Sequence, residues 1–492
     1  MPLKQLATLK RYLAGERLRA RALAGGTWLA GGSLTSQAFR LARNIVLARL
    51  LAPQSFGAMA IVLSIGSMMD AFTEVGTREA VIQSPRGSEA GFLNAAWWFA
   101  AVRGVASYGL IFTLAPGVAS FYHDTELTAL IRVALLAIVF RGVMSPASFL
   151  SLKAMDFKRW AGLQYGSAIV GSLVTVALAI PFPSVWALCI GFAAEYAVLC
   201  LASYIWFAFL PKLRIDKSSL QELWKFSRGV LGLSFLNLIY VRADVFVLGK
   251  VISGEQLGIY SLVISSAQAA STFLLNYQGQ ILLPLFSQLQ GNVERTNGIL
   301  AKGASIVSIL FIPALIFTFF SGRTVLTLMY GSIYATAFWP LVLAVATIFL
   351  NVLNAQITTV FYAVGRPQLH RTCVLLMVVV MAVLIYPASS YWQMAGAQGA
   401  ALIAMIVGYA IQIGQLRTLH GLRLAVDIKK LGLQLAGPLV VLTIAIAVRN
   451  SIAVSSPAQN LLFGSVLSIS AVLCGGWILL RTSGRRLSME ST

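Results

Sequence analysis

Six arginines lie within stretches of this chain that are otherwise apolar enough to cross a membrane. The chain has 492 residues, of which 58% are hydrophobic and 11% are charged, and its mean hydropathy is +0.81. An arginine at the centre of a bilayer costs at least about 2.5 kcal/mol, so it normally faces a polar cavity and a partner. The same stretches hold four acids, Asp70, Glu74, Glu195 and Asp244. The arginines are Arg40, Arg43, Arg103, Arg132, Arg141 and Arg242.

The apolar stretches predict an all-α integral membrane protein, because a helix needs about 20 apolar residues to cross the hydrocarbon core. We expect about fourteen transmembrane helices. Their predicted ranges are 25–48, 57–77, 92–115, 127–151, 160–180, 185–209, 227–249, 258–286, 300–320, 336–362, 372–390, 397–416, 431–448 and 461–480.

The distribution of lysine and arginine predicts the orientation. With a cytoplasmic N-terminus, 27 of the 37 basic residues fall in cytoplasmic segments, 4 fall on the opposite side, and the remaining six are the intramembrane arginines. Cytoplasmic loops carry such an excess in membrane proteins. We therefore expect a multi-pass membrane protein with both termini in the cytoplasm. The net charge of +21 is then a topology signal and requires no nucleic-acid partner.

The chain contains an internal repeat. The stretch from Arg43 to Gly57 and the stretch from Arg242 to Tyr260 each have an arginine deep in a span, an apolar run, a polar turn and a new span. One register pairs Arg49 with Lys250, and a two-residue gap instead pairs Arg43 with Arg242. Six spans separate the copies, so both cross the membrane in the same sense, which predicts two parallel six-helix lobes and two additional C-terminal helices.

This repeat gives a domain plan. We expect a basic cytoplasmic N-terminal segment at 1–24, an N-lobe at 25–210, a cytoplasmic inter-lobe loop at 211–226, a C-lobe at 227–420, two further spans within 431–480, and a cytoplasmic tail at 481–492.

Polar residues in the first span follow helical spacing. Gln37, Arg40 and Arg43 lie on one stripe, which must line a cavity or a helix interface. Glu195 is a counter-charge for Arg103, Arg132 or Arg141. Each arginine either contacts a ligand directly or forms a structural pair, and an excess of arginine over acid in a membrane cavity indicates a cargo with negative charge. The candidate substrate-binding residues are Gln37, Arg40, Arg43, Arg103, Arg141, Asn237 and Arg242.

Acidic residues are candidates for counter-charge or coupling. Asp70, Glu74 and Arg78 are spaced by four, so Glu74 and Arg78 can pair on one helix face, as a structural salt bridge or as a gate. Asp244 shares a face with Asn237 and could bind a coupling cation or proton, or a structural partner. The second half of the chain is richer in amides, which suit sugar hydroxyls.

Several classes of protein are disfavoured by the motifs. The three histidines fall in connections, no P-loop is present, and the four cysteines show no spacing typical of a metal site or a disulfide framework. We therefore expect no enzyme and no resident cofactor or metal, and the only small ligand besides the substrate would be a coupling ion, Na⁺ or H⁺.

The motifs resemble a known family. The stretch Leu47–Gly57, followed by the acid-bearing second span, resembles the opening of the Wzx-type polysaccharide transporters of the MOP exporter superfamily, and Arg242–Tyr260 resembles the start of their second lobe. The resemblance implies a flippase that moves undecaprenyl-pyrophosphate-linked oligosaccharide to the periplasmic leaflet for O-antigen, capsule or exopolysaccharide assembly. It also implies a V-shaped pair of lobes around a cationic cavity, and alternating access driven by an ion gradient.

Alternatives remain open at this point. Members of the same superfamily include lipid II flippases and multidrug or cation antiporters, and the chain could instead be a non-transporting scaffold of a polysaccharide assembly complex. The expected partners are the lipid-linked oligosaccharide, the bilayer, and a polysaccharide polymerase with its chain-length regulator.

The topology is testable with reporter fusions at Glu89 and Asn460. Fourteen spans place Glu89 in the cytoplasm and Asn460 on the opposite side. A periplasm-active reporter should therefore be active only when fused at Asn460, and a cytoplasm-active reporter only at Glu89. Activity of one reporter at both positions would show that the predicted number of spans is wrong.

Overall fold

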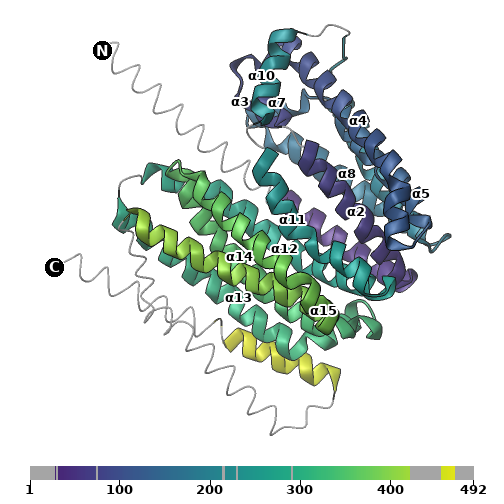
Figure 1. The fold of residues 1–492 in the computed structure, drawn as a ribbon, viewed down its shortest axis with the longest axis vertical. Coiled ribbons are helices and arrows are strands. Elements are labelled where there is room, and N and C mark those ends of the chain that lie inside the picture. Colours follow the sequence, from purple (N-terminus) through teal and green to yellow (C-terminus); the bar gives the residue numbers. More distant parts are fainter. Residues whose placement is uncertain are drawn as a thin grey trace. The chain divides into compact units, whose positions relative to one another are not determined.

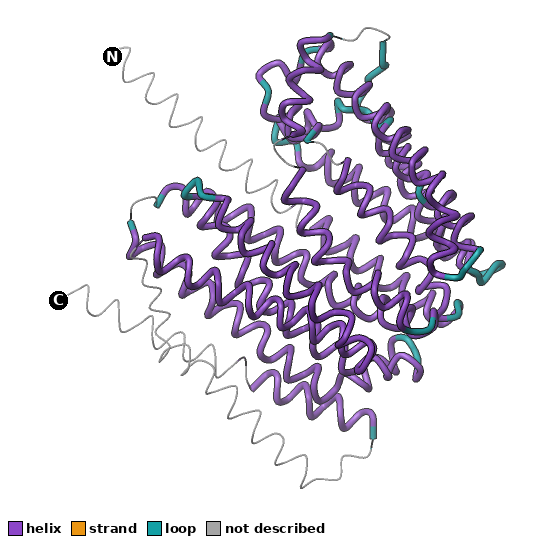
Figure 2. Tube along the Cα trace, viewed as in Figure 1, coloured by secondary structure: helices purple, strands orange, loops and turns teal. Residues whose placement is uncertain are grey.

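A computed structural model describes residues 28, 31–73, 76–212, 216–228, 231–289, 292–420, 456–470 and 472. Helices, joined by short turns, make up the described residues, and Figure 2 shows no strand among them. The chain divides into two compact units, Met1–Leu238 and Ile239–Thr492 (Figure 1). The all-α membrane fold expected from the sequence is confirmed.

Unit 1 is a bundle of long and short helices. In chain order these are the helix 31–50, α2 (Pro53–Thr73), α3 (Thr77–Gln83), η1 (Pro85–Ser88), α4 (Ala90–Tyr122), α5 (Glu126–Ala134), α6 (Leu136–Gly142), α7 (Ser148–Lys153), α8 (Phe157–Ala179), α9 (Val185–Trp206) and α10 (Lys217–Arg228).

Unit 2 contains fewer and longer helices, and α11 (Leu231–Val251) leads into it across the unit boundary. The others are α12 (Gly254–Gln288), α13 (Val293–Met329), η2 (Ser332–Ala337), α14 (Phe338–Ala363), α15 (Pro367–His420) and the helix 457–470.

Six helical segments of the described chain are long and apolar enough to cross a membrane. They are α4, α8, α9, α13, the continuous stretch of η2 and α14, and α15. The total of fourteen spans stays a prediction, as does the parallel relation of the two halves. The thirteenth predicted span, 431–448, lies outside the described residues, as do the N-terminal segment 1–24 and the tail 481–492.

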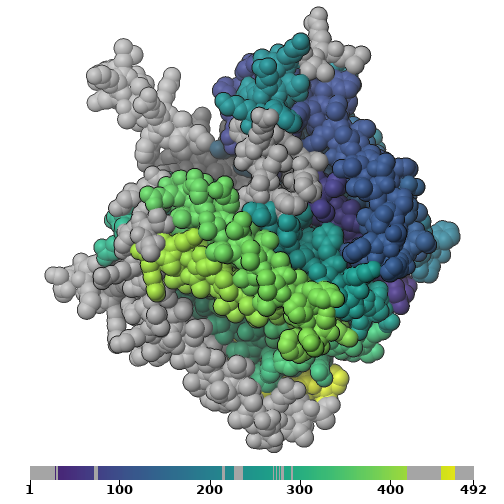
Figure 3. Space-filling model, viewed as in Figure 1, coloured from purple at the N-terminus to yellow at the C-terminus, as the bar shows by residue number. Residues whose placement is uncertain are grey.

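The surface of α4 fits a lipid environment. Val102, Val105, Leu110 and Phe121 are each more than half exposed, and α4 forms the blue part of the surface of unit 1 in Figure 3. An apolar face of this size is normally covered. Apolar side chains can contact lipid hydrocarbon without a free-energy penalty, so this face of α4 is suited to contact the bilayer.

The fourth predicted span, 127–151, is not one helix but three, α5, α6 and α7. The break after Gly142 frees the carbonyl of Val143, which accepts hydrogen bonds from the Tyr204 hydroxyl (2.5 Å) and from Trp97 Nε1 (3.1 Å). Ser145 donates its backbone N–H to Ser203 Oγ at 3.0 Å. A broken helix is tolerated at membrane depth only when neighbouring side chains satisfy its backbone, and α4 and α9 do so here.

Helix α15 covers the eleventh and twelfth predicted spans, 372–390 and 397–416. It is two helices joined at Gln393, whose φ of 49° is left-handed. The Gln393 side chain accepts a hydrogen bond from Gln256 Nε2 at 3.1 Å. A Cβ at Gly396 would collide with the carbonyl of Ala388, so glycine permits the two helices to turn back on each other.

The predicted inter-lobe loop, 211–226, contains helix α10, which packs against α3 and α4. The start of α10 is held against η1, because Arg86 Nη2 lies 3.0 Å from Asp216 Oδ2. Hydrogen bonds from Ser219, Ser218 and Arg86 hold the pKa of Asp216 well below its usual range. Hydrogen bonds to Asp216 and Glu89 raise the pKa of Arg86. The connection is therefore a docked helix.

Candidate functional site

An ion pair joins the first helix of unit 1 to α9. Arg40 Nη2 lies 2.5 Å from Glu195 Oε1. The Glu195 side chain is 11% exposed, whereas the Arg40 side chain is 38% exposed. The carboxylate is thus enclosed by the bundle, and the guanidinium has donors left for another acceptor, since it carries five N–H groups.

A second pair lies in the same unit. Arg141 Nη1, on α6, is 2.5 Å from Asp70 Oδ2, on α2, and both side chains are about one-third exposed. The Arg141 guanidinium also lies 5.6 Å from the ring centroid of Tyr196. Tyr196 interacts electrostatically with Arg40, Glu195, Arg141 and Asp70. The two ion pairs therefore form one cluster around Tyr196.

Gly171 allows the close helix packing that positions Glu195. A Cβ added at Gly171, on α8, would lie 2.5 Å from Glu195 Cβ and 2.9 Å from Glu195 Cα. The backbones of α8 and α9 approach this closely because small residues are used where membrane helices pack. Sequence reasoning missed Gly171, and the available signal was a glycine mid-way along an apolar span.

Arg43 adds positive charge to the cluster. Its Nε and Nη2 donate to Asn44 Oδ1 at 3.3 and 3.1 Å, and it interacts electrostatically with Arg40 and Glu195. Within the described chain Arg43 has no carboxylate in ion-pair range. Among the described residues, three guanidinium groups thus share two carboxylates, which leaves one more positive charge than negative charge in this set.

The remaining predicted residues of unit 1 lie in several places. Gln37 is half-buried on the helix of Arg40, and Arg103 is half-buried on α4, beside the glycine contact between Gly104 and Gly142. Arg132 lies over the Phe112 ring, 3.9 Å from its centroid, and donates to the Phe112 carbonyl.

The predicted pair of Glu74 and Arg78 stays a prediction. Helix α3, which carries Arg78, begins at Thr77. Arg78 is exposed and lies 5.6 Å from the Trp160 ring. Glu74 itself lies outside the described residues.

Unit 2 holds a buried acid of a different kind. Tyr260 donates its hydroxyl to Asp244 Oδ2 at 2.6 Å, and Gln398 Nε2 donates to that hydroxyl, also at 2.6 Å. The backbone N–H of Val245 donates to Asp244 Oδ1 at 2.7 Å. All three side chains are more than nine-tenths buried. The chain of hydrogen bonds links α11, α12 and α15.

One expectation about α11 needs adjustment. Asn237 and Asp244 share a face by spacing, but Asn237 is exposed and Asp244 is buried. Arg242 interacts electrostatically with Asp244. Sequence reasoning did not anticipate Tyr260 or Gln398 as partners of this acid, because their contacts join helices far apart in the chain.

The counter-charge assignment is corrected in one respect. Glu195 was expected beside Arg103, Arg132 or Arg141, and it pairs with Arg40 instead. The acid beside Arg141 is Asp70. Each pairing depends on which helices are neighbours, and helical spacing within one span carries no such information.

An all-helical bundle with charged clusters within its apolar helices defines a polytopic membrane protein. A solved structure of the lipid II flippase MurJ in an inward closed conformation superposes with a TM-score of 0.75 at 12% identity, covering 92% of this chain and 99% of that one. An inward-facing MATE family multidrug transporter of the MOP superfamily gives 0.61 at 14% identity, covering 79% and 98%. At such identities the likeness shows the fold alone.

The sequence comparison gives the family. Residues 46–339, more than half of the chain, match the polysaccharide biosynthesis protein family, and the chain belongs to it. The succinoglycan biosynthesis transport protein ExoT of Rhizobium meliloti (strain 1021) is 23% identical over 66% of this chain. The lipopolysaccharide biosynthesis protein WzxC of Escherichia coli (strain K12) is 22% identical over 64%. The alignments cover 65% and 64% of these relatives' own lengths. The resemblance to the Wzx-type transporters is confirmed.

The Arg40–Glu195 pair can be tested by a double-mutant cycle. Glu195→Leu leaves Arg40 without its carboxylate, and Arg40→Leu leaves Glu195 without its cation. Each single variant should lower the free energy of unfolding by about 1–3 kcal/mol, less than for a fully buried pair because Arg40 is partly exposed. The double variant Arg40→Leu/Glu195→Leu should recover most of that loss. Thermal unfolding in detergent and membrane abundance measure both.

The control is Glu294→Ala, which removes an exposed acid at the start of α13 and should leave stability within about 0.5 kcal/mol of the parent. Strictly additive effects of the Arg40 and Glu195 substitutions would show that the two side chains do not stabilise each other.

Proposed function

We propose that this protein is a flippase of the bacterial inner membrane. It moves undecaprenyl-pyrophosphate-linked oligosaccharide to the periplasmic leaflet for O-antigen, capsule or exopolysaccharide assembly. The observation that carries the proposal is the surplus of guanidinium over carboxylate in the unit 1 cluster, where Arg40 and Arg141 remain more than one-third exposed. The family membership and the names of the two relatives support a polysaccharide precursor as the cargo.

The chemistry of the cluster suits a pyrophosphate. A pyrophosphate that leaves water needs its oxygens satisfied, and planar guanidinium groups do this with paired, charge-assisted hydrogen bonds. Glu195 and Asp70 hold Arg40 and Arg141 in place while the site is empty. Because each carboxylate occupies few of the five donors of its arginine, an incoming phosphate can share the guanidinium without expelling the acid.

Other functions of the same fold fit the cluster less well. A cation or drug antiporter would need more acid than base at the site, and the cluster has the opposite balance. A scaffold has no reason to bear the cost of intramembrane arginines. A lipid II flippase also carries a pyrophosphate, so the cluster does not separate the two cargos; the names of the relatives favour a polysaccharide unit.

We assign the coupling of transport to an ion gradient to unit 2. Asp244 is a buried acid that accepts a hydrogen bond from the neutral Tyr260 hydroxyl, and this hydroxyl in turn accepts one from Gln398. Such a site can take up a proton or Na⁺ and exchange it during alternating access, with the ion gradient driving transport. We also propose that both termini lie in the cytoplasm and that the partners include a polysaccharide polymerase and its chain-length regulator.

The arginine cluster predicts a specific loss of export. Arg40→Ala and Arg43→Ala should lower surface polysaccharide, normalised to the amount of protein in the membrane, by at least about tenfold, because each removes a charge-assisted contact worth ~1.5–3 kcal/mol. Arg103→Ala and Arg141→Ala should also reduce it. Arg40→Lys keeps the charge but loses the planar fork, so its loss should be partial.

Arg132→Ala is the matched control, because Arg132 contacts Phe112 and lies outside the cluster. It should leave normalised export unchanged even if it lowers abundance. If the alanine variants of the three cluster arginines and of Arg103 all reduce abundance while export per molecule stays at the parental value, the arginines have a structural role and the proposed site is wrong.

The coupling proposal predicts that Asp244→Asn uncouples transport. Asparagine retains an oxygen for the Tyr260 hydroxyl and removes the charge. In proteoliposomes, parental protein should translocate labelled lipid-linked substrate faster under an imposed Na⁺ or pH gradient, and Asp244→Asn should lose at least about nine-tenths of that stimulation. Asp124→Asn, in the exposed turn after α4, should retain it. Full stimulation of Asp244→Asn would exclude this acid as the coupling site.

A further inference from the structure

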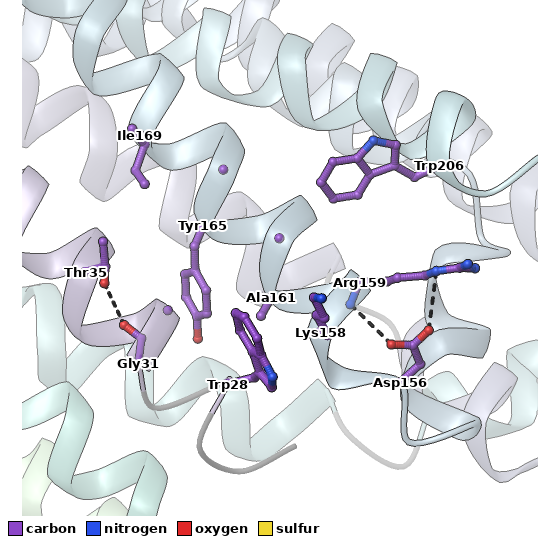
Figure 4. A pocket seen from close by; sticks show the side chains of 13 residues that line it. Trp28, Gly31, Thr35, Asp156, Lys158, Arg159, Ala161, Tyr165, Ile169 and Trp206 are labelled. Atoms are coloured by element: carbon purple, nitrogen blue, oxygen red, sulfur yellow. Dashed lines mark hydrogen bonds and ion pairs between the residues drawn. The ribbon is translucent and has the colours of Figure 1, made fainter. Parts of the chain in front are cut away.

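Unit 1 has an open groove of about 1140 Å³, separate from the charged cluster. Three helix ends form it: the start of the helix 31–50, the start of α8 and the end of α9 (Figure 4). This volume exceeds the ~300–1,000 Å³ typical of sites for small molecules. The groove is therefore large enough for part of a lipid.

Glycines form the floor of the groove. A Cβ at Gly31 or at Gly166 would meet nothing within 4 Å, so both face open space. A Cβ at Gly162 would lie 3.0 Å from the Trp206 ring, so this glycine lets the indole lie close to α8. Together with Ile169 these residues give an apolar channel along α8.

Aromatic side chains form the walls. Trp28 and Trp206 are 53% and 48% exposed, and Tyr165 lies between the two helices that face each other across the groove (Figure 4). Tryptophan and tyrosine are enriched where a membrane protein meets the headgroup layer. The mouth of the groove is therefore suited to the depth at which lipid headgroups lie.

The described residues that line the groove carry one net positive charge, from Lys158, Arg159 and Asp156. Lys158 Nζ lies 5.1 Å from the Trp28 ring centroid and carries no ion pair within the described chain. Arg159 Nε is 3.4 Å from Asp156 Oδ2, so this acid offsets one of the two cations. Arg159 stays 67% exposed, and its other donors remain accessible.

We infer that this groove binds one anionic glycerophospholipid of the phosphatidylglycerol class. One acyl chain lies along Gly31, Gly162 and Gly166, and the phosphodiester contacts Lys158 and Arg159. A single phosphodiester carries one negative charge, which matches the net charge at the mouth. The positive-inside pattern assigns this end of the helices to the cytoplasmic leaflet, where basic residues attract anionic lipid.

The net charge of the described lining residues also disfavours the transported substrate as the occupant of the groove. A pyrophosphate carries more negative charge than the mouth can balance, because Asp156 lies beside Arg159 and would repel it. The three-guanidinium cluster of Arg40, Arg43 and Arg141 is better matched to that headgroup. The groove is thus a site for a resident membrane lipid, and the inference does not depend on the proposed function.

Native mass spectrometry of the purified full-length protein tests the inference, with phosphatidylglycerol and phosphatidylethanolamine of identical acyl chains as probes. We expect one phosphatidylglycerol to bind at least about fivefold more tightly than phosphatidylethanolamine. Lys158→Gln should weaken phosphatidylglycerol about fivefold, the effect of one basic residue at a membrane surface. Gly166→Leu puts a side chain into the open space of the groove and should reduce binding of that lipid at least tenfold.

Matched controls separate the groove from general effects. Gly109→Leu places the same side chain at an exposed position of α4 where a Cβ also meets nothing, and Lys302→Gln removes an exposed cation of α13. Both should bind phosphatidylglycerol like the parent. Thermal unfolding of all four variants confirms that each is folded.

Three results would each overturn the inference. The first is equal binding of the two phospholipids by the parent protein, and the second is unchanged phosphatidylglycerol binding in both groove variants. The third is competition in which undecaprenyl pyrophosphate displaces phosphatidylglycerol at equal concentration and loses its own affinity in Gly166→Leu. Export normalised to abundance tests the flippase proposal independently, through the arginine cluster.

Discussion

The cost of a guanidinium group in hydrocarbon governs the arrangement of unit 1. Arg40, Arg43 and Arg141 can be held in a bundle of apolar helices only if acids and polar groups surround them. Glu195 and Asp70 supply the acids, and Gly171 lets α9 approach α8 closely enough to hold Glu195 in position. Removing either acid would leave charge uncompensated, so the arginines and the helix packing depend on each other. Among the described residues, this cluster holds more base than acid, which is the feature that the proposed anion site uses.

Hydrogen bonding imposes a second constraint on the same unit. The break between α6 and α7 exposes backbone groups at membrane depth, and Tyr204, Trp97 and Ser203 satisfy them. A polar side chain in an apolar span therefore has two quite different uses here, binding the backbone of a neighbour or forming the charged cluster. Composition alone does not distinguish them. The geometry does, because Tyr204 and Trp97 both point at the carbonyl of Val143.

The sequence was sufficient to predict the helical class and the positions of many helices. Helical periodicity and apolar length decide these properties, and they act within one segment. The partners were not predictable. Glu195 lies 155 residues from Arg40, and Gln398 lies 138 residues from Tyr260, so each contact depends on which helices are neighbours. The break in 127–151 was missed for a related reason, since the groups that make it tolerable belong to α4 and α9.

The two units differ in how they hold charge, and the difference bears on mechanism. Unit 1 presents partly exposed guanidinium groups, which can exchange one oxygen ligand for another without a large change in solvation. Unit 2 encloses Asp244 with Tyr260 and Gln398, all more than nine-tenths buried, where gain or loss of a single charge changes the electrostatic energy strongly because the surroundings are apolar. In the proposed mechanism, an anionic cargo acts on unit 1 and a small cation acts on unit 2. A ligand can shift a conformational equilibrium only through its differential affinity for the two states. Two separate sites with opposite charge preference therefore let an ion gradient bias the transport of a large anion, because the coupling ion and the anion do not compete for the same side chains.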